Sequence, residues 1–229
     1  MVISFGSGDD QRTVRLPIDG VVLEGDLTVP PQAAGLVIFA HGSGSSRLSP
    51  RNRFVAQVLV NAGFATLLLD LLTSQEEAFE RHTGELRFDI GLLASRLGRV
   101  AGWARQDAQL AALPFGLFGA STGGGAALVA AAERPDLFRA VVSRGGRPDL
   151  AGAALGRVQA PTLLVVGAHD PVVVRLNEEA YGQLRGLKRL AVVPGATHLF
   201  EEPGALEHVA QLAADWFGRH LAGRLGAPA

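Results

Sequence analysis

Short apolar runs alternate along the chain with longer segments in which apolar residues recur at every third or fourth position. The apolar runs cover residues 35–40, 64–69, 115–118, 140–142, 162–166 and 190–193. Runs of this length with few polar residues are typical of strands that are buried on both faces of a sheet. Two alternating segments, 13–18 and 21–29, are joined by Asp19-Gly20 and predict a β-hairpin at the start of the chain.

The longer periodic segments predict helices at 51–62, 89–112, 122–133, 178–184 and 206–221. Strands that alternate with helices are typical of a mostly parallel sheet covered by helices on both faces. Neither an internal repeat nor a low-complexity linker interrupts this pattern. We therefore expect one domain over residues 1–229, with a core at about 12–222 and an end that frays at 225–229.

The composition favours a globular protein and removes several classes of function. With 48% hydrophobic and 19% charged residues, the 229-residue chain can bury a core of its own. The net charge of −1 gives no electrostatic reason to expect nucleic acid or an acidic membrane surface as a partner. The absence of cysteine excludes disulfides, thiolate metal ligands and a cysteine nucleophile. No leader-like or membrane-spanning stretch stands out, so we expect a cytoplasmic protein without a membrane anchor.

The strongest chemical signal is the pentapeptide Gly119-Ala-Ser-Thr-Gly123, which follows a predicted strand and opens a helix rich in small residues. A serine on so sharp a strand-to-helix turn has a strained backbone that lifts its hydroxyl above the edge of the sheet. The glycines two positions before and after it remove side chains that would clash in the turn. The pattern predicts that Ser121 is a nucleophile, although a glycine-rich helix start can also serve packing or phosphate binding.

A serine hydroxyl needs a base within hydrogen-bond reach, and that base needs an acid to orient it. His198 follows the last predicted strand, and Asp170 follows the strand before it. The order serine, acid, histidine is the one found in α/β-hydrolases. We therefore predict a triad of Ser121, Asp170 and His198, with Asp149, beyond the strand at 140–142, as the rival acid.

A tetrahedral intermediate also needs two N–H donors for its oxyanion. One would be the backbone N–H of Thr122, directly after the nucleophile, and the other should come from the turn His41-Gly42-Ser43. We choose Ser43, with Gly44 as a close competitor, and interpret His41 as a residue that orients its loop. Phosphate-binding alternatives fail, because the chain has no Gly-x-x-x-x-Gly-Lys-Ser/Thr motif and this turn lacks the third glycine of a dinucleotide fingerprint.

With these motifs in hand, the chain resembles the α/β-hydrolases, and more narrowly their small, cap-less dienelactone-hydrolase-like branch. The motifs that carry the resemblance are His41-Gly-Ser-Gly-Ser-Ser46, Gly119-Ala-Ser-Thr-Gly123, Ser143-Arg-Gly-Gly-Arg-Pro-Asp149, Gly167-Ala-His-Asp170 and Gly195-Ala-Thr-His198. The likeness runs over about 14–217 and implies an eight-stranded, mostly parallel sheet with no large cap domain. Ser121 stands where dienelactone hydrolases carry cysteine, which favours ordinary carboxylic esters as substrates.

The resemblance implies acyl transfer in two steps, with an ester as the small-molecule partner and with no metal or organic cofactor. Only residues 143–161 connect two late strands where caps are usually inserted, so we expect an open site for small esters, with 71–85 as the other possible cover. An acyltransferase or perhydrolase with the same triad is one alternative. A ligand-binding module that has no catalytic activity is another. The oligomeric state stays open.

Two arginines complete the candidate site. Arg144 and Arg147 follow the strand next to the one that leads to Asp170, and we expect them at the rim of the site, together with His41, Gly42 and Gly44. Guanidinium groups there could bind a substrate carboxylate. The simpler interpretation is a solvated loop whose arginines pair with Asp149 or with the acidic segment 71–85.

Overall fold

A single eight-stranded sheet forms the centre of the molecule. The computed structural model describes residues 8–222, and the predicted fraying of 225–229 lies outside them. The strands are β1 (Asp10–Ile18), β2 (Val21–Val29), β3 (Leu36–Ala40), β4 (Ala65–Leu69), β5 (Phe115–Ala120), β6 (Phe138–Arg144), β7 (Thr162–Gly167) and β8 (Lys188–Val193). Their order is β1-β2-β4-β3-β5-β6-β7-β8, and every neighbouring pair from β4 to β8 is parallel. The prediction of a mostly parallel sheet is confirmed.

The antiparallel part of the sheet is the N-terminal hairpin. β1 pairs with β2, and β2 in turn pairs antiparallel with β4. Asp19 and Gly20 both have positive φ values, 47° and 84°, as a two-residue hairpin turn of this kind requires. The hairpin that Asp19-Gly20 predicts is therefore confirmed, although β1 begins at Asp10, three residues earlier than expected.

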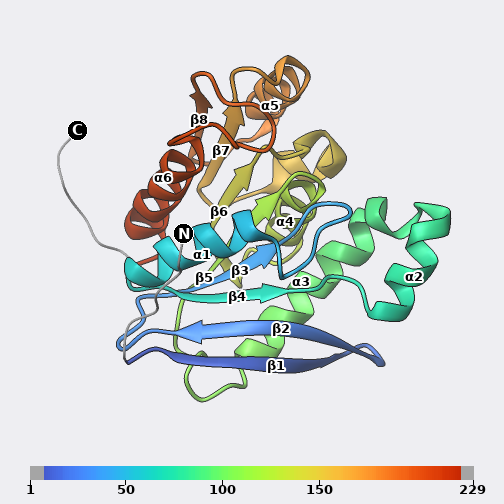
Figure 1. The fold of residues 1–229 in the computed structure, drawn as a ribbon, viewed down its shortest axis with the longest axis vertical. Coiled ribbons are helices and arrows are strands. Elements are labelled where there is room, and N and C mark those ends of the chain that lie inside the picture. Colours follow the sequence, from blue (N-terminus) through green and yellow to red (C-terminus); the bar gives the residue numbers. More distant parts are fainter. Residues whose placement is uncertain (1–7, 223–229) are drawn as a thin grey trace.

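Helices cover both faces of the sheet (Figure 1). They are α1 (Pro50–Asn61), α2 (Ser74–Thr83), α3 (Ile90–Ala104), α4 (Thr122–Glu133), α5 (Pro171–Gln183) and α6 (Ala205–His220), with 3-10 segments η1 (Leu86–Phe88) and η2 (Pro148–Arg157). α1 and α6 pack on one face, and α3, α4 and α5 pack on the other. Because β3, β4, β5 and β7 are buried at every position, the apolar runs in the sequence belong to strands covered on both sides.

Two helix predictions were wrong in their bounds. The predicted helix 89–112 ends at Ala104, because Arg105 turns back and donates hydrogen bonds to Ala111 O and Leu113 O, each 2.8 Å away. The predicted helix 178–184 begins earlier, at Pro171. Asp170 caps this helix, and proline occupies its first position. Both are start signals of a helix, but the β-branched valines that follow them favour a strand, so the start was not predicted.

The helix α2 was not predicted at all. It starts at a capping box in which Thr73 Oγ1 accepts from Glu76 N–H and the Glu76 carboxylate accepts from Thr73 N–H. The pattern Thr-x-x-Glu is a known start signal and could have been found in the sequence. This helix lies in the segment 71–85 that we expected as a possible cover. Among residues 8–222, no helix is long and apolar enough to cross a membrane.

Candidate active site

The candidate residues converge at one edge of the sheet. Ser121 follows β5, Asp170 follows β7, and His198 lies in the loop after β8. Because these strands are parallel and belong to one sheet, their carboxyl ends open onto the same edge, where sheets of this kind bind ligands. The turn from His41 to Ser46 follows β3, the neighbour of β5, and reaches the same edge.

Ser121 has the strained backbone that its motif predicts. Its φ is 51° and its ψ is −122°, a left-handed conformation that costs a residue with a side chain free energy. The strain is supported on both sides, because Ser121 N–H donates to Arg144 O at 3.2 Å and Ser121 O accepts from Arg147 N–H at 3.0 Å. A Cβ on Gly123 would lie 2.2 Å from Ala40 O, so only glycine fits there.

The carboxylate that contacts the candidate base is Asp170. Its Oδ2 lies 2.7 Å from His198 Nδ1, and its Oδ1 accepts from Val173 N–H at the start of α5. The helix N-terminus favours the charged carboxylate and fixes its orientation. Asp149 instead makes two hydrogen bonds with Arg147, at 2.9 and 2.7 Å. Of the two acids that the sequence offered, Asp170 is therefore the one that orients His198.

The end of β6 and the segment after it contact both Ser121 and His198. A Cβ on Gly145 would lie 3.4 Å from His198 Cε1, so the imidazole packs directly on this glycine. Gly145 follows Arg144, whose carbonyl holds the Ser121 amide. Within residues 8–222, no hydrogen bond joins Ser121 Oγ to the His198 ring. In enzymes without substrate this contact is often longer and forms fully in the complex.

The two candidate oxyanion donors lie next to each other. Ser43 N–H donates to Thr122 Oγ1 at 2.9 Å, and Ser43 Oγ is 3.0 Å from the same atom. The Thr122 N–H is the first of α4 and has no acceptor within its own helix. Gly42 packs against the nucleophile, since a Cβ there would lie 3.0 Å from Ser121 Cβ. The Thr122 side chain thus holds the Ser43 amide beside Ser121.

Removal of this hydroxyl is expected to loosen the Ser43 amide. Thr122→Val should lower kcat for a p-nitrophenyl ester about tenfold with little change in KM, because a donor for the oxyanion acts mainly in the transition state. Thr122→Ser keeps the hydroxyl and is the matched control, with kcat near the parent value. An unchanged kcat in Thr122→Val would exclude a role for the Ser43 amide and favour Gly44. An increase would show that the hydroxyl competes with the oxyanion.

The loop that carries Ser43 is anchored at both ends. His41 is buried, its Nδ1 donates to Gly42 O at 2.9 Å, and its Nε2 accepts from Leu71 N–H at 3.0 Å. An imidazole in this arrangement is neutral, with its proton on Nδ1. This geometry agrees with the interpretation of His41 as a residue that orients its loop.

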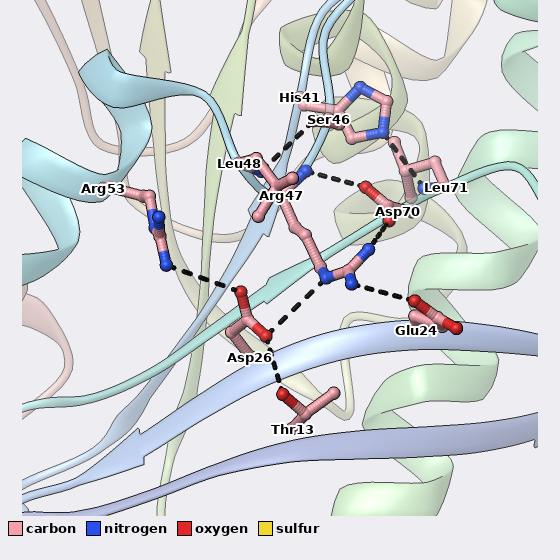
Figure 2. Close-up of polar contacts among 10 residues, drawn as sticks. All are labelled: Thr13, Glu24, Asp26, His41, Ser46, Arg47, Leu48, Arg53, Asp70 and Leu71. Carbon is pink, nitrogen blue, oxygen red and sulfur yellow. Dashed lines mark hydrogen bonds and ion pairs between the residues drawn. The ribbon is translucent and has the colours of Figure 1, made fainter.

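The second anchor is Arg47, which sequence reasoning missed (Figure 2). The Arg47 guanidinium pairs with Asp70, Glu24 and Asp26. The backbone N–H of Arg47 donates to Asp70 Oδ1 at 2.7 Å. Burial alone would lower the pKa of Arg47, but the hydrogen bond and charge of Asp70, with the charges of Asp26 and Glu24, raise it above its usual value. No spacing in the sequence marks these partners, because they lie on β2 and just after β4.

Arg47→Met is expected to lower the free energy of unfolding by about 1–2 kcal/mol, because three carboxylates then face one another with only Arg53, 4.0 Å from Asp26, as a cation beside them. The looser loop should also lower kcat. Urea unfolding followed by circular dichroism, together with ester kinetics, measures both effects. Arg15→Met is the control, since Arg15 is exposed on β1 and its loss should change stability by less than about 0.5 kcal/mol. Equal effects of the two substitutions would contradict the anchor.

A cavity of about 470 Å³ lies beside the elbow. Thr122 and the segment 41–46 line one side, and α2 with η1 lines the other through Glu77, Glu80, Arg81 and Arg87. α2 is held in place by Glu76, which Arg96 Nη1 contacts at 2.8 Å. Burial would raise the pKa of Glu76, but the hydrogen bonds of Arg96 lower it, so this carboxylate stays charged at neutral pH. The expected cover therefore contains a short helix that forms one wall of this cavity.

Arg144 is the last residue of β6 and Arg147 follows that strand, and the two arginines have different surroundings. Arg147 pairs with Asp149, as in the simpler interpretation. Arg144 is buried, lies 3.5 Å from Asn52 Oδ1, and has no carboxylate within 4.0 Å in the described chain. The sequence did not single out Arg51, which lines the cavity close to Arg144.

Comparisons with known proteins agree with this arrangement. The chain matches the sequence model of the Dienelactone hydrolase family over residues 20–221. A crystal structure of dienelactone hydrolase from Anabaena variabilis has a TM-score of 0.91 and 58% identity, over 93% of this chain and 99% of that one. Sheet, elbow and acid–histidine pair together define an α/β-hydrolase without a large cap. Within that class, the chain belongs to the dienelactone hydrolase family, and the resemblance seen in the sequence is confirmed.

More distant and longer relatives add to this comparison. Est1E from Butyrivibrio proteoclasticus, solved with ferulic acid, has a TM-score of 0.77 at 20% identity over 91% of this chain and 99% of that one, a likeness of fold alone. Two Mycobacterium tuberculosis proteins named “Putative phosphoribosyl transferase” are 62% identical over 210 residues, 92% of this chain. The chain spans only 46% of the length of these two relatives.

Proposed function

We propose that this chain is a serine hydrolase that cleaves small carboxylic esters through an acyl-enzyme intermediate. The observation that carries the proposal is the 2.7 Å contact between His198 Nδ1 and Asp170 Oδ2, at the edge of the sheet where Ser121 stands in a left-handed conformation. Membership of the dienelactone hydrolase family supports an ester-like substrate. The serine in place of cysteine favours ordinary esters over dienelactone.

The geometry supports a sequence of proton transfers. Asp170 accepts from His198 Nδ1–H, which leaves Nε2 unprotonated and able to take the Ser121 proton. The Ser121 oxygen attacks the ester carbonyl. The backbone N–H of Thr122 stabilises the oxyanion, together with the Ser43 N–H, which turns from Thr122 Oγ1 to the oxyanion. His198 then protonates the leaving alcohol. Water, deprotonated by the same histidine, releases the acid and restores Ser121.

The two longer Mycobacterium tuberculosis relatives share with this chain the segment that the family model matches. Their match covers 92% of this chain, and the family model covers 20–221, so both describe largely the same segment. That segment holds the elbow and the acid–histidine pair. We therefore assign ester hydrolysis, and not phosphoribosyl transfer, to the site on this chain.

Rapid mixing with p-nitrophenyl acetate tests the proposal. We expect a burst of p-nitrophenolate equal to the concentration of sites, followed by steady turnover, because an activated ester acylates the serine faster than water hydrolyses the acyl-enzyme. Release no faster than in buffer would contradict the proposal and favour a binding module. Added alcohol or amine acceptors separate a transferase from a hydrolase, since an acyltransferase would transfer most of the acyl group to the acceptor rather than to water. Hydrogen peroxide is the corresponding acceptor for a perhydrolase.

A further inference from the structure

The guanidinium of Arg144 is buried without a partner of opposite charge. Its side chain is 7% exposed, and the described residues place no carboxylate within 4.0 Å of it. Nη2 makes a long contact of 3.5 Å with Asn52 Oδ1, while Nε and Nη1 are buried with no hydrogen-bond acceptor in the same part of the chain. Since Nε carries one hydrogen and Nη1 two, three N–H groups are unsatisfied.

The surroundings make this charge costly. The Phe200 ring is a weak partner, because its centroid is 6.0 Å from Arg144 Cζ, at the outer limit of a cation–π contact. Burial, together with the nearby charge of Arg51, lowers the pKa of Arg144 to about 10. Arg144 is therefore still charged at neutral pH. A buried cation of this kind is normally paired with an anion.

A second guanidinium lies at the same place. Arg51 lines the cavity, and the next residue, Asn52, contacts Arg144, so the buried guanidinium lies close to this part of the cavity without lining it. Arg51 Nη1 pairs with Glu201 Oε1 at 3.1 Å, but its Nε is buried with no hydrogen-bond acceptor in the described chain. The Glu201 side chain is 63% exposed, and so exposed an ion pair contributes little and can be exchanged for a ligand.

The backbone adds to the positive potential. Arg51 and Asn52 lie in the first turn of α1, a helix of 12 residues that Ser49 caps. The N–H groups and the dipole at such an end favour negative charge. The place is also close to the chemistry, because Arg144 precedes Gly145, on which the His198 ring packs.

We propose that Arg144 and Arg51 form an anion subsite that binds a carboxylate or phosphate group on the substrate and places its ester bond beside Ser121. This inference rests on the proposed function and deepens it by naming the substrate class, an ester with a second, negatively charged group. An anion between the two guanidinium groups supplies acceptors for the unsatisfied N–H groups and removes the repulsion between the two cations. Glu201 then turns toward solvent.

Paired esters test the subsite. Mono-p-nitrophenyl glutarate carries a free carboxylate, and p-nitrophenyl valerate is its neutral counterpart of similar length. Arg144→Met and Arg51→Met should each lower kcat/KM for the glutarate ester about ten- to a hundredfold more than for the valerate ester. Arg144→Lys, which keeps the charge, should lose less than Arg144→Met. Arg53→Met is the control on the same helix, since Arg53 is half exposed and faces Asp26, and it should lower neither. Equal losses on the two esters, or no loss on either, would overturn the subsite.

Calorimetry gives a readout that does not depend on turnover. Glutarate and inorganic phosphate are titrated separately into the parent protein and into Arg51→Met. We expect at least one of them to bind the parent and to bind Arg51→Met at least about tenfold more weakly. Binding of glutarate alone assigns a carboxylate, and binding of phosphate alone assigns a phosphate. If neither binds while p-nitrophenyl valerate is still hydrolysed, the subsite is wrong and the hydrolase stands. If p-nitrophenyl valerate is not hydrolysed either, the result contradicts the proposed hydrolase function itself.

Discussion

Ser121→Ala is expected to lower kcat/KM for p-nitrophenyl esters by at least about three orders of magnitude, because His198 then has no hydroxyl to deprotonate. Residues of a triad act as a unit, so the remaining Asp170–His198 pair gives little rescue. Folding should be preserved, since alanine in the same left-handed conformation bears the same strain as serine and leaves the backbone contacts of the elbow intact. Steady-state kinetics and a thermal melt followed by circular dichroism measure the two quantities.

Ser45→Ala is the matched control for this experiment. Ser45 lies in the glycine–serine turn and lines the cavity, but the histidine near it, His41, has both ring nitrogens bonded to the backbone of Gly42 and Leu71. We expect its loss to change kcat/KM less than about threefold. Activity of Ser121→Ala above about 10% of the parent would exclude Ser121 as the nucleophile and leave Ser43 or Ser45 as the candidates.

Asp170→Asn is expected to have the second largest effect, a loss of about three to four orders of magnitude in kcat. An asparagine amide can donate to His198 Nδ1, which places the ring proton on Nε2 and removes the base. Asp149→Asn breaks only the ion pair with Arg147, so its loss should stay below about tenfold. The two variants differ from the parent by the same chemical change. If Asp149→Asn proves to be the inactive variant, the triad is assigned to the wrong acid.

The sequence predicted the sheet well because most of its strands are covered on both sides. Unbroken apolar runs in the sequence correspond to β3, β4, β5 and β7. The turn pair Asp19-Gly20 indicates the hairpin. The elbow was also visible, since the glycines two positions before and after Ser121 are spaced as this tight turn requires. A Cβ at Gly119 would lie 2.5 Å from Gly123 O. A steric constraint between residues close in the chain, such as this one, can be recognised from the residue types at those positions.

Contacts between residues far apart in the chain cannot be recognised from the local sequence in this way. The Arg47 anchor depends on Asp70 and on strand β2, and nothing near Arg47 in the sequence indicates them. Arg144 looked like a loop residue at the rim, yet it is the last residue of β6, with its side chain buried near α1. The choice between Asp149 and Asp170 likewise needed the fold, because only the three-dimensional arrangement brings His198 to one of them.

Covalent labelling of the nucleophile is the most direct test of the central claim. The parent protein is treated with diethyl p-nitrophenyl phosphate, which transfers its phosphoryl group to an activated serine, and peptides are then analysed by mass spectrometry. We predict a single adduct on Ser121, with ester hydrolysis lost in proportion to labelling and with no adduct in Asp170→Asn on the same time scale. Labelling at another residue together with loss of activity, or full activity after complete labelling of Ser121, would contradict the account.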